Sequence, residues 1–352
     1  MEHEKIVGLD LGDKFSYACV VSAETGEVIQ EKRISTRASC LETFLAEQPA
    51  MLIAIETGTH SPWISRLLES LGHEVLVANA RKVRLIYGGD RKSDKLDAQK
   101  LARLARFDPK LLSPIQHRGK DAQAHLALIR SRDALVSSRV GLVNHVRGSV
   151  KAFGARLPVC STRTFARKAR AVIPEELLAA LEPVLAIIEK LSEQILVMEK
   201  RIKVLGKEAY PETNVLRQVT GVGAITALTF ILTLEEPSRF KKSRDVGAFL
   251  GLTPGQKQSG NRDVKLRISK RGDEGLRRLL VQSAHYLLGP FGSDCDLRRH
   301  GEKIEAGGGG YAKQRAIVAV ARKLAVLLHR LWLTREIYEP LRNSDKTLAQ
   351  AA

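Results

Sequence analysis

Several features that would indicate common classes of protein are scarce or missing in this 352-residue sequence. Aromatic residues make up only 5% of it, which argues against a recognition surface built mainly on aromatic stacking. No uninterrupted run of 18 apolar residues is present, so we expect no helix that spans a membrane. The first residues form no basic segment followed by an apolar one, so we also expect no signal peptide.

The residues that bind metals through sulfur or nitrogen are too scattered to predict a site. Cys19, Cys40, Cys160 and Cys295 lie far apart without a Cys-x-x-Cys pair, so we expect buried thiols in a reducing cytoplasm. The nine histidines form no HxxxH or HxH cluster, which argues against a zinc hydrolase. The glycine-rich phosphate loop of Walker-type NTPases is also absent.

Positive charge is what the sequence has in excess. It contains 57 Lys and Arg against 39 Asp and Glu, a net charge of +18, while 44% hydrophobic residues exclude a wholly disordered chain. Residues 239–278 hold twelve cations against four acids, and residues 120–151 hold six against two. Such an excess indicates a polyanionic partner, and without a membrane segment nucleic acid is the leading one.

The order of apolar segments predicts an α/β domain followed by a mainly α-helical remainder. Strands are expected at 5–11, 15–22, 27–34, 51–55 and 73–78, and a helix at 93–107. The expected regions are 1–118, an α/β domain; 119–212, basic, helical and coiled coil; 213–342, mainly α; and 343–352, a disordered tail. In the third region, a Gly221-Val-Gly223 turn between apolar helices predicts a helix-hairpin-helix-like segment.

A heptad pattern is the clearest periodic signal. Steps of four and three residues connect Leu177, Leu181, Val184, Ile188, Leu191, Ile195, Met198, Ile202 and Leu205. This spacing is typical of a coiled coil. The partner helix could belong to the same chain, as an internal hairpin, or to another protomer. We expect the second case, and hence a homodimer or homotetramer.

Four acids form the first candidate for catalysis. Asp10 lies in an apolar strand, where an unpaired charge is costly, and Glu56 ends another apolar strand. Asp94 and Asp97 share one face of a predicted helix. Mg²⁺, or alternatively Mn²⁺, binds carboxylate oxygens, and two-metal sites clamp both reacting oxygens of a phosphodiester. The set predicts a metal site for phosphoryl transfer.

Each acid also has a structural interpretation, as a turn residue, a cap or a solvent-facing side chain. Asp94 and Asp97 could stabilise the N-terminus of their helix, and Asp97 could pair with Lys100 or Arg103. His60, near the second acid in sequence, could assist it or be an ordinary loop residue.

Ser259 is the second candidate. It belongs to GLTPGQKQSG (residues 251–260), which we expect to be a glycine-flanked loop in the most basic segment. A positive field helps to deprotonate a serine and stabilises the charge that develops on a phosphate. The spacing alone favours a simpler role, in which Ser259 only donates a hydrogen bond to a phosphate.

Together these segments resemble the DEDD transposases of insertion sequence family 110 and its 1111 subgroup, over about residues 5–335. In the first half GLDLG, AIETGTHSPW and RKSDKLDAQKLARL contain the four acids. In the second half the similar segments are LRQVTGVGAITA, FLGLTPGQKQSGNRDVKLRISKRGDEGLRRLL and AIVAVARKLA. Asn261 departs from the second glycine that many members have there.

The resemblance implies an RNase H-like first domain, similar to RuvC-type Holliday junction resolvases, whose four acids bind Mg²⁺. It implies that Ser259, which matches the family's QSG motif, is the recombination nucleophile. It also implies guidance by a structured noncoding RNA, the bridge RNA, that pairs with donor and target DNA. The acids of one protomer would act with the serine of another.

We expect the guide RNA to contact the basic helix at 121–153 and DNA to contact 239–278, although some of these arginines could form internal salt bridges. The predicted nucleic-acid contacts are Arg130, Arg132, Arg139, Arg147, Lys151, Lys257, Arg262, Lys270, Arg271, Arg277 and Arg278. Two other functions remain open. A RuvC-like metal-dependent junction nuclease would leave Ser259 idle, and a non-enzymatic nucleic-acid-binding assembly protein would leave Asp10 unexplained.

Overall fold

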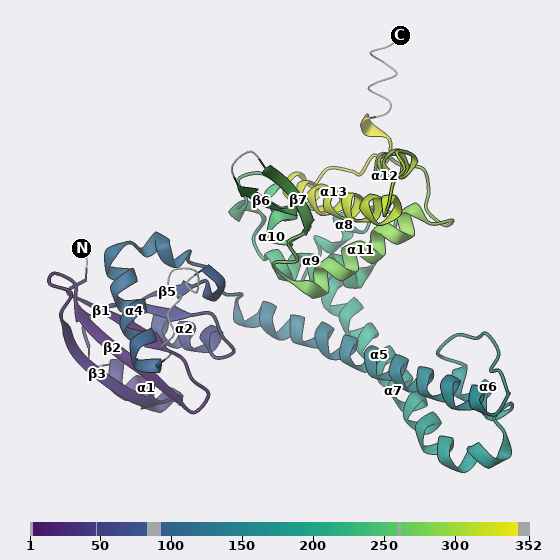
Figure 1. Cartoon of the computed structure of the whole chain (residues 1–352), viewed down its shortest axis with the longest axis horizontal. Helices are drawn as coiled ribbons and strands as arrows, with labels where there is room; N and C mark the ends of the chain where they lie inside the picture. Colours follow the sequence, from purple (N-terminus) through teal and green to yellow (C-terminus); the bar gives the residue numbers. More distant parts are fainter. Residues whose placement is uncertain (1–2, 47, 83–92, 260–261, 344–352) are drawn as a thin grey trace, which may run out of the picture. The chain divides into compact units, whose positions relative to one another are not determined.

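The computed structural model describes residues 3–46, 48–82, 93–259 and 262–343, with the backbone alone for 256–259 and 262–265. The chain divides into two compact units, Met1–Gly119 and Lys120–Ala352 (Figure 1). The further boundary between 212 and 213 stays a prediction, and residues 344–352 of the expected tail lie outside the described part.

A five-stranded mixed sheet forms the centre of the first unit. Its strands are β1 (Lys5–Asp10), β2 (Phe15–Ser22), β3 (Val28–Ser35), β4 (Leu52–Glu56) and β5 (Glu74–Ala78), in the order β3-β2-β1-β4-β5. The first three strands form an antiparallel meander, while β1, β4 and β5 run parallel. The predicted mixed α/β sheet is therefore confirmed, and it is consistent with the RNase H-like fold that the resemblance implies.

Helices cover both faces of this sheet. They are α1 (Ala38–Leu45), α2 (Ser61–Ser70) and α4 (Asp94–Phe107), followed by the short 3-10 helix η1 (Pro109–Leu112). Because side chains alternate along a strand, the two faces bury different residues. Val7 and Leu9 of β1 pack with α1 and α2, whereas Ile6 packs with α4.

The second unit begins with two long helices that pack side by side in opposite directions (Figure 1). They are α5 (Lys120–Ala152) and α7 (Glu175–Glu208), and the short α6 (Phe165–Arg170) packs near their joined end. Val146 and Val150 of α5 meet Leu185 and Ile188 of α7 in one core cluster, which Phe165 completes. The segment that joins the two long helices thus contains a short helix of its own.

The heptad pattern of α7 is used in part within the chain. Leu181, Ile188, Ile195 and Ile202, at every seventh position, are buried, and both ends of this row belong to clusters with α5. The other seam positions are only partly buried: Leu177, Val184, Leu191, Met198 and Leu205. Leu177, Val184 and Leu205 also pack at the margins of these clusters, so the internal hairpin accounts for more than the buried row, and a coiled coil between protomers stays a prediction.

The remaining helices pack around a shared core. They are α8 (Thr213–Leu216), α9 (Ala224–Leu234), η2 (Pro237–Arg239), α10 (Asp245–Phe249), α11 (Glu274–Leu288), α12 (Asp296–Ala306) and α13 (Ala312–Thr334). From Thr226 to Leu234, every residue of α9 is buried. Phe230 meets Trp332 of α13 edge-on, with 6.4 Å between ring centroids.

A two-stranded hairpin interrupts these helices, formed by β6 (Pro254–Ser259) and β7 (Arg262–Ile268). The prediction of a loop at 251–260 is therefore wrong for residues 254–259. β6, with the sequence PGQKQS, has no apolar alternation, whereas Val264, Leu266 and Ile268 of β7 alternate with charged residues as in a strand.

The expectations for membrane-spanning helices and for the cysteines can be compared with the described residues. No helix within them is long and apolar enough to cross a bilayer. All four cysteines are free thiols; Cys19 and Cys295 are buried as expected, whereas Cys40 and Cys160 are partly exposed.

Candidate active site and nucleic-acid interface

Two of the predicted acids end neighbouring strands at one edge of the sheet. β1 and β4 run parallel, with Leu9 opposite Ile55. The next residue in each strand is its last, Asp10 in β1 and Glu56 in β4. Since neighbouring strands lie about 4.8 Å apart, the two side chains start from adjacent backbone positions.

Both acids belong to the set of strand residues that faces α4. Asp10 is four residues after Ile6, and Glu56 is four residues after Leu52, so the alternation of side chains puts each pair on one face. Ile6 and Leu52 share a core cluster with Ala98 of α4. The helix that carries the other two acids therefore covers the face to which the strand acids belong.

α4 lies directly on β1 because Gly8 has no side chain. A Cβ at this position would stand 2.0 Å from the carbonyl oxygen of Ala98 and 2.5 Å from the backbone nitrogen of Ala102. Any other residue would have to push α4 away from the sheet. Gly8 is thus required for the close packing that brings α4 to the acids, a role that the GLDLG segment alone does not indicate.

The direction of α4 brings its first turn toward the acid-bearing edge. Arg106, near the end of α4, donates hydrogen bonds to the carbonyls of Ala23 at 2.9 Å and Glu24 at 2.5 Å. These carbonyls follow β2 beside the start of β1. The first turn, with Asp94 and Asp97, therefore lies toward the end of β1.

The donor chemistry of the acids fits Mg²⁺, which prefers carboxylate oxygens. Oδ1 of Asp97 lies 3.4 Å from Nζ of Lys100, one of the pairings expected for it, and Asp94 is exposed. Within the described residues, no three His, Cys, Asp or Glu side chains are close enough together to hold a metal. The described arrangement thus places two acids side by side without bringing a third ligand to them.

A hydrogen-bonded chain borders the same edge. Nε2 of His60 lies 3.2 Å from Oδ1 of Asp13, and Nε1 of Trp63 donates to Nδ1 of His60 at 3.0 Å. Because an indole only donates, Nδ1 is the acceptor, and the neutral ring donates from Nε2 to Asp13. Asp13 follows β1 and His60 follows β4. Because Asp13 and His60 are 47 positions apart, no local pattern predicts their pairing.

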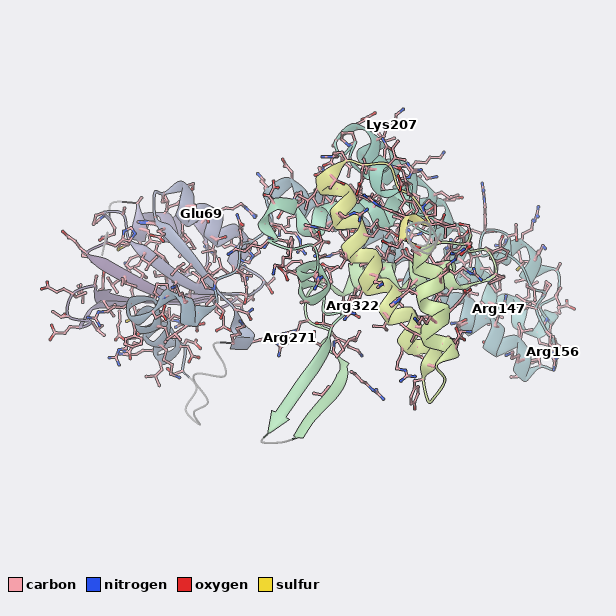
Figure 2. The ribbon with its side chains drawn as sticks, turned by 90° about the horizontal axis from the view of Figure 1, so that it is seen from above. Glu69, Arg147, Arg156, Lys207, Arg271 and Arg322 are labelled. Carbon is pink, nitrogen blue, oxygen red and sulfur yellow. The ribbon has the colours of Figure 1, made fainter. Side chains whose placement is uncertain are left out.

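Ser259 is the last residue of β6, where its backbone pairs with Arg262 at the start of β7. The side chains of Ser259, Lys257 and Arg262 lie outside what the structure describes. Figure 2 shows the hairpin extending away from the helices of its unit. The candidate nucleophile is therefore at the far end of the hairpin, five positions after Pro254 at its base.

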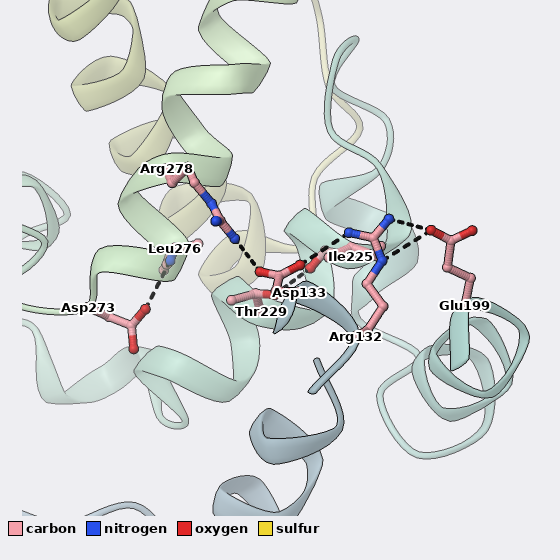
Figure 3. Close-up of polar contacts among 8 residues, drawn as sticks. All are labelled: Arg132, Asp133, Glu199, Ile225, Thr229, Asp273, Leu276 and Arg278. Atoms are coloured by element: carbon pink, nitrogen blue, oxygen red, sulfur yellow. Dashed lines mark hydrogen bonds and ion pairs between the residues drawn. The ribbon is translucent and has the colours of Figure 1, made fainter. Parts of the chain in front are cut away.

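Four of the predicted nucleic-acid contacts form ion pairs or hydrogen bonds with side chains inside the chain. In Figure 3, Asp133 lies between Arg132, 3.1 Å away, and Arg278 of α11. Arg132 also donates from Nε to Glu199 of α7 at 3.1 Å. These contacts join α5, α7 and α11. We call them the arginine junction.

The other two arginines extend this arrangement along α5. Arg130 lies 3.2 Å from Asp273, and Arg139 donates to Ser192 at 3.2 Å. Burial lowers the pKa of Arg139, and nearby Arg132 lowers it further. From the sequence, we considered that some of these arginines could form salt bridges within the chain. Whether these arginines also contact nucleic acid stays a prediction.

The remaining predicted contacts differ in exposure. The guanidinium of Arg147 stacks on Phe165, 5.3 Å from the ring centroid. Arg277 donates to the carbonyl of Leu250 at 3.1 Å. Lys151, Lys270 and Arg271 are exposed, and the last of these is labelled in Figure 2.

Comparison with known proteins covers both units. Residues 7–154 match a transposase family model of the DEDD type of IS110 elements, and residues 213–290 match the transposase family of IS116, IS110 and IS902. The chain is 33% identical over 297 residues to the transposase for insertion sequence element IS1328 of Yersinia enterocolitica, covering 82% of this chain and 85% of the relative.

Two further relatives extend over nearly the full length. The transposase for insertion sequence element IS1111A of Coxiella burnetii is 28% identical over 347 residues, which covers 96% of this chain and 92% of the relative. A probable family 20 transposase of Pseudomonas aeruginosa is 27% identical, with 95% and 98% covered. These relatives therefore match both the unit that contains the five-stranded sheet and the helical unit.

Proposed function

From the premise that the chain belongs to the IS110 family of insertion-sequence transposases, we propose that it is a site-specific DNA recombinase guided by a structured RNA, with Ser259 as nucleophile. A transposase acts on DNA by cleaving and rejoining its strands. The finer proposal concerns how this chain does so. It assigns the covalent step to the hairpin and metal binding to the acids of the first unit.

The proposed covalent step is a transesterification. Oγ of Ser259 attacks the phosphorus of a DNA phosphodiester, so that an Oγ–P bond forms and the P–O3′ bond breaks. The serine proton passes to solvent, and the released O3′ takes up a proton. A 3′ hydroxyl of another strand then attacks the phosphoserine and restores the serine hydroxyl. One phosphoester replaces another at each step, so the bond energy is conserved.

The acids are proposed to hold Mg²⁺, with Asp10 and Glu56 as the central pair and Asp94 and Asp97 as further ligands. Mg²⁺ bound there would neutralise negative charge on phosphate oxygens. The observation that carries this assignment is the register of β1 and β4. It sets one acid at the end of each of two neighbouring strands, on the face that α4 covers.

Two partners complete the proposal. The guide RNA would follow α5, where Lys151 is exposed and Arg147 lies on the ring of Phe165. A second copy of the chain would pack on α7 at seam positions that are only partly buried and belong to none of the internal clusters, Leu191 and Met198. This would give a homodimer, or a homotetramer by repetition.

Substitution of the serine tests the covalent step. Ser259→Ala should abolish strand exchange and the protein–DNA adduct that survives on a denaturing gel. Ser269→Ala, at the base of the same hairpin, is the matched control and should keep both. An adduct formed by the Ser259→Ala variant would exclude Ser259. Metal-dependent cleavage without any adduct in the unmodified protein would favour the junction nuclease.

Substitution of an acid and analysis of bound RNA test the other parts. Asp10→Asn should lose strand exchange while retaining RNA, because it removes one ligand charge at the end of a strand. Sequencing of RNA that co-purifies with the chain should return a transcript encoded beside its own gene. RNA of random origin would contradict the guide.

A further inference from the structure

A cavity of about 580 Å³ lies in the second unit, and its lining residues are not among the predicted nucleic-acid contacts. Its walls come from α13, the start of α12, the residues at 338–343 and the residues that precede α10 and β6. Five of its side chains are cationic: Arg244, Arg322, Lys323, Arg330 and Arg342. Figure 2 labels Arg322 on α13. These cations come from three separate parts of the sequence and converge only in the fold.

The carboxylates nearby leave part of this positive charge unbalanced. Oδ2 of Asp296 accepts hydrogen bonds from the backbone nitrogen of Asn343 at 2.8 Å and from its Nδ2 at 2.9 Å. Glu339, the other acid of the lining, is exposed.

Ion pairing within the second unit separates the cations into two groups. Arg330 and Arg342 share Glu336, each at 2.8 Å. Among the described residues, no ion pair joins Arg244, Arg322 or Lys323 to a carboxylate. Three cations of the cavity are thus available to an anion.

The cavity walls are held in place by packing. A Cβ on Gly247 would stand 2.9 Å from Cγ of Arg322, so this arginine lies close against α10. The buried His329 of α13 bonds Ser243 through Nδ1 at 3.0 Å and the carbonyl of Pro237 through Nε2 at 2.9 Å. These contacts tie α13 to the segment that carries Arg244. A preformed site loses less entropy when it binds a ligand.

Two further observations indicate an anion. Nε of Arg330 is buried and has no acceptor in the part of the chain that the structure describes. A buried donor without a partner is costly, so this wall of the cavity has a hydrogen-bonding group that the described chain does not satisfy. The potential is also positive beyond the cavity. Burial lowers the pKa of His300, and Lys323 and Arg322 lower it further.

We propose that this cavity binds a backbone phosphate of the nucleic acid on which the transposase acts. The inference rests on the proposed function, since it assumes that the strand also reaches Ser259. Thr253 lines the cavity and directly precedes β6. At about 3.4 Å per residue, six residues from Thr253 to Ser259 span about 20 Å. A nucleic-acid strand covers that distance in about six nucleotides.

The test measures how binding depends on salt. Fluorescence anisotropy with a labelled 20-base-pair DNA duplex, and separately with an RNA hairpin, would be recorded from about 50 to 200 mM salt. Lys323→Ala should lower the affinity and reduce the slope of log affinity against log salt by about 0.9, the effect of one phosphate contact. Arg322→Ala should act in the same direction. Lys313→Ala, which removes an exposed cation from the same helix outside the cavity, is the control.

Each outcome has a definite meaning. A reduced slope with DNA supports the proposal, whereas a reduced slope with RNA alone overturns it, because the guide is not the strand that Ser259 is proposed to attack. Slopes equal to that of Lys313→Ala with both probes overturn the proposal. Because Lys323 is exposed, its removal should leave the unfolding temperature unchanged, which a thermal scan checks. Ser259→Ala should lose the adduct but keep the slope, so failure of the nucleophile and failure of the cavity are distinguishable.

Discussion

Gly8→Ala should change the positions of the four acids relative to one another while leaving all four acids in the chain. The new Cβ would stand 2.0 Å from the carbonyl oxygen of Ala98, whereas close carbon–oxygen contacts are about 3.3 Å. α4 would therefore move away from β1 by about 1.3 Å. Overpacking of this kind costs about 1 to 3 kcal/mol. At roughly 4 °C per kcal/mol, the unfolding temperature of the first unit should fall by about 4 to 12 °C.

The expected effect on catalysis is larger than the effect on folding. Asp94 and Asp97 move with α4, while Asp10 and Glu56 stay on the sheet. A displacement of about 1 Å at a reacting centre can lower a rate about 100-fold. Strand exchange by the purified protein should fall by about that factor at a temperature where both units are folded. DNA and RNA affinity, which depend on the second unit in our proposal, should change little.

The control for this prediction is Gly148→Ala on α5, where a Cβ meets no atom within 4 Å. It should keep wild-type exchange, and it should not lower the unfolding temperature, because alanine is the better helix former. If Gly8→Ala unfolds and recombines as the unmodified protein does, α4 does not need its close approach to β1. The role that we assign to its first turn would then be refuted.

Two further predictions concern stability. Asp133→Asn removes the charge shared by Arg132 and Arg278, and it should destabilise the second unit by about 1 to 2 kcal/mol, between the values for exposed and buried pairs. Asp121→Asn on the same helix is the control, and an equal unfolding temperature for both variants would show that the arginine junction contributes nothing. Burial lowers the pKa of His73 below its usual value of about 6.5, so the unfolded chain takes up a proton that the folded first unit excludes. The stabilisation is complete above about pH 6.5 and is lost as the pH falls below it. His73→Gln should therefore reduce the difference between the unfolding temperatures measured at about pH 5.5 and 7.5. An unchanged difference would exclude His73 as the source of this pH dependence.

The sheet and its acids could be predicted because each depends on local signals. The run from Met51 to Ile55 is apolar throughout, as in a strand buried on both faces, and an acid directly after it must lie at an edge of the sheet. Asp10 stands out because it ends a similar run. These patterns need no knowledge of which strands pair. Their pairing, which makes the two acids neighbours, follows only from the parallel register of β1 and β4.

The features that the sequence did not predict depend on partners far along the chain. The heptads of α7 indicate a partner helix without saying which one, and α5 of the same chain supplies it for the buried row and for part of the rest of the seam. The contact of Asp133 with Arg278 spans 145 positions. β7 carries an apolar alternation typical of a strand, but β6 has none, so the hairpin follows only from the backbone pairing of the two.

The distribution of charge shows why local density alone is a poor guide to the nucleic-acid interface. Arg132 and Arg278 belong to the two most basic segments, yet both form ion pairs with Asp133 in the folded chain, and Arg132 also pairs with Glu199. Arg322 and Lys323 lie in an ordinary amphipathic helix, and among the described residues neither forms an ion pair with a carboxylate. A phosphate gains most from cations that have no carboxylate nearby, because it does not compete with an internal partner. Lys323→Ala should therefore reduce the slope of log affinity against log salt by more than Arg132→Ala does, although only Arg132 lies in a segment of high positive charge. The reverse order would show that internal pairing does not decide which cations bind.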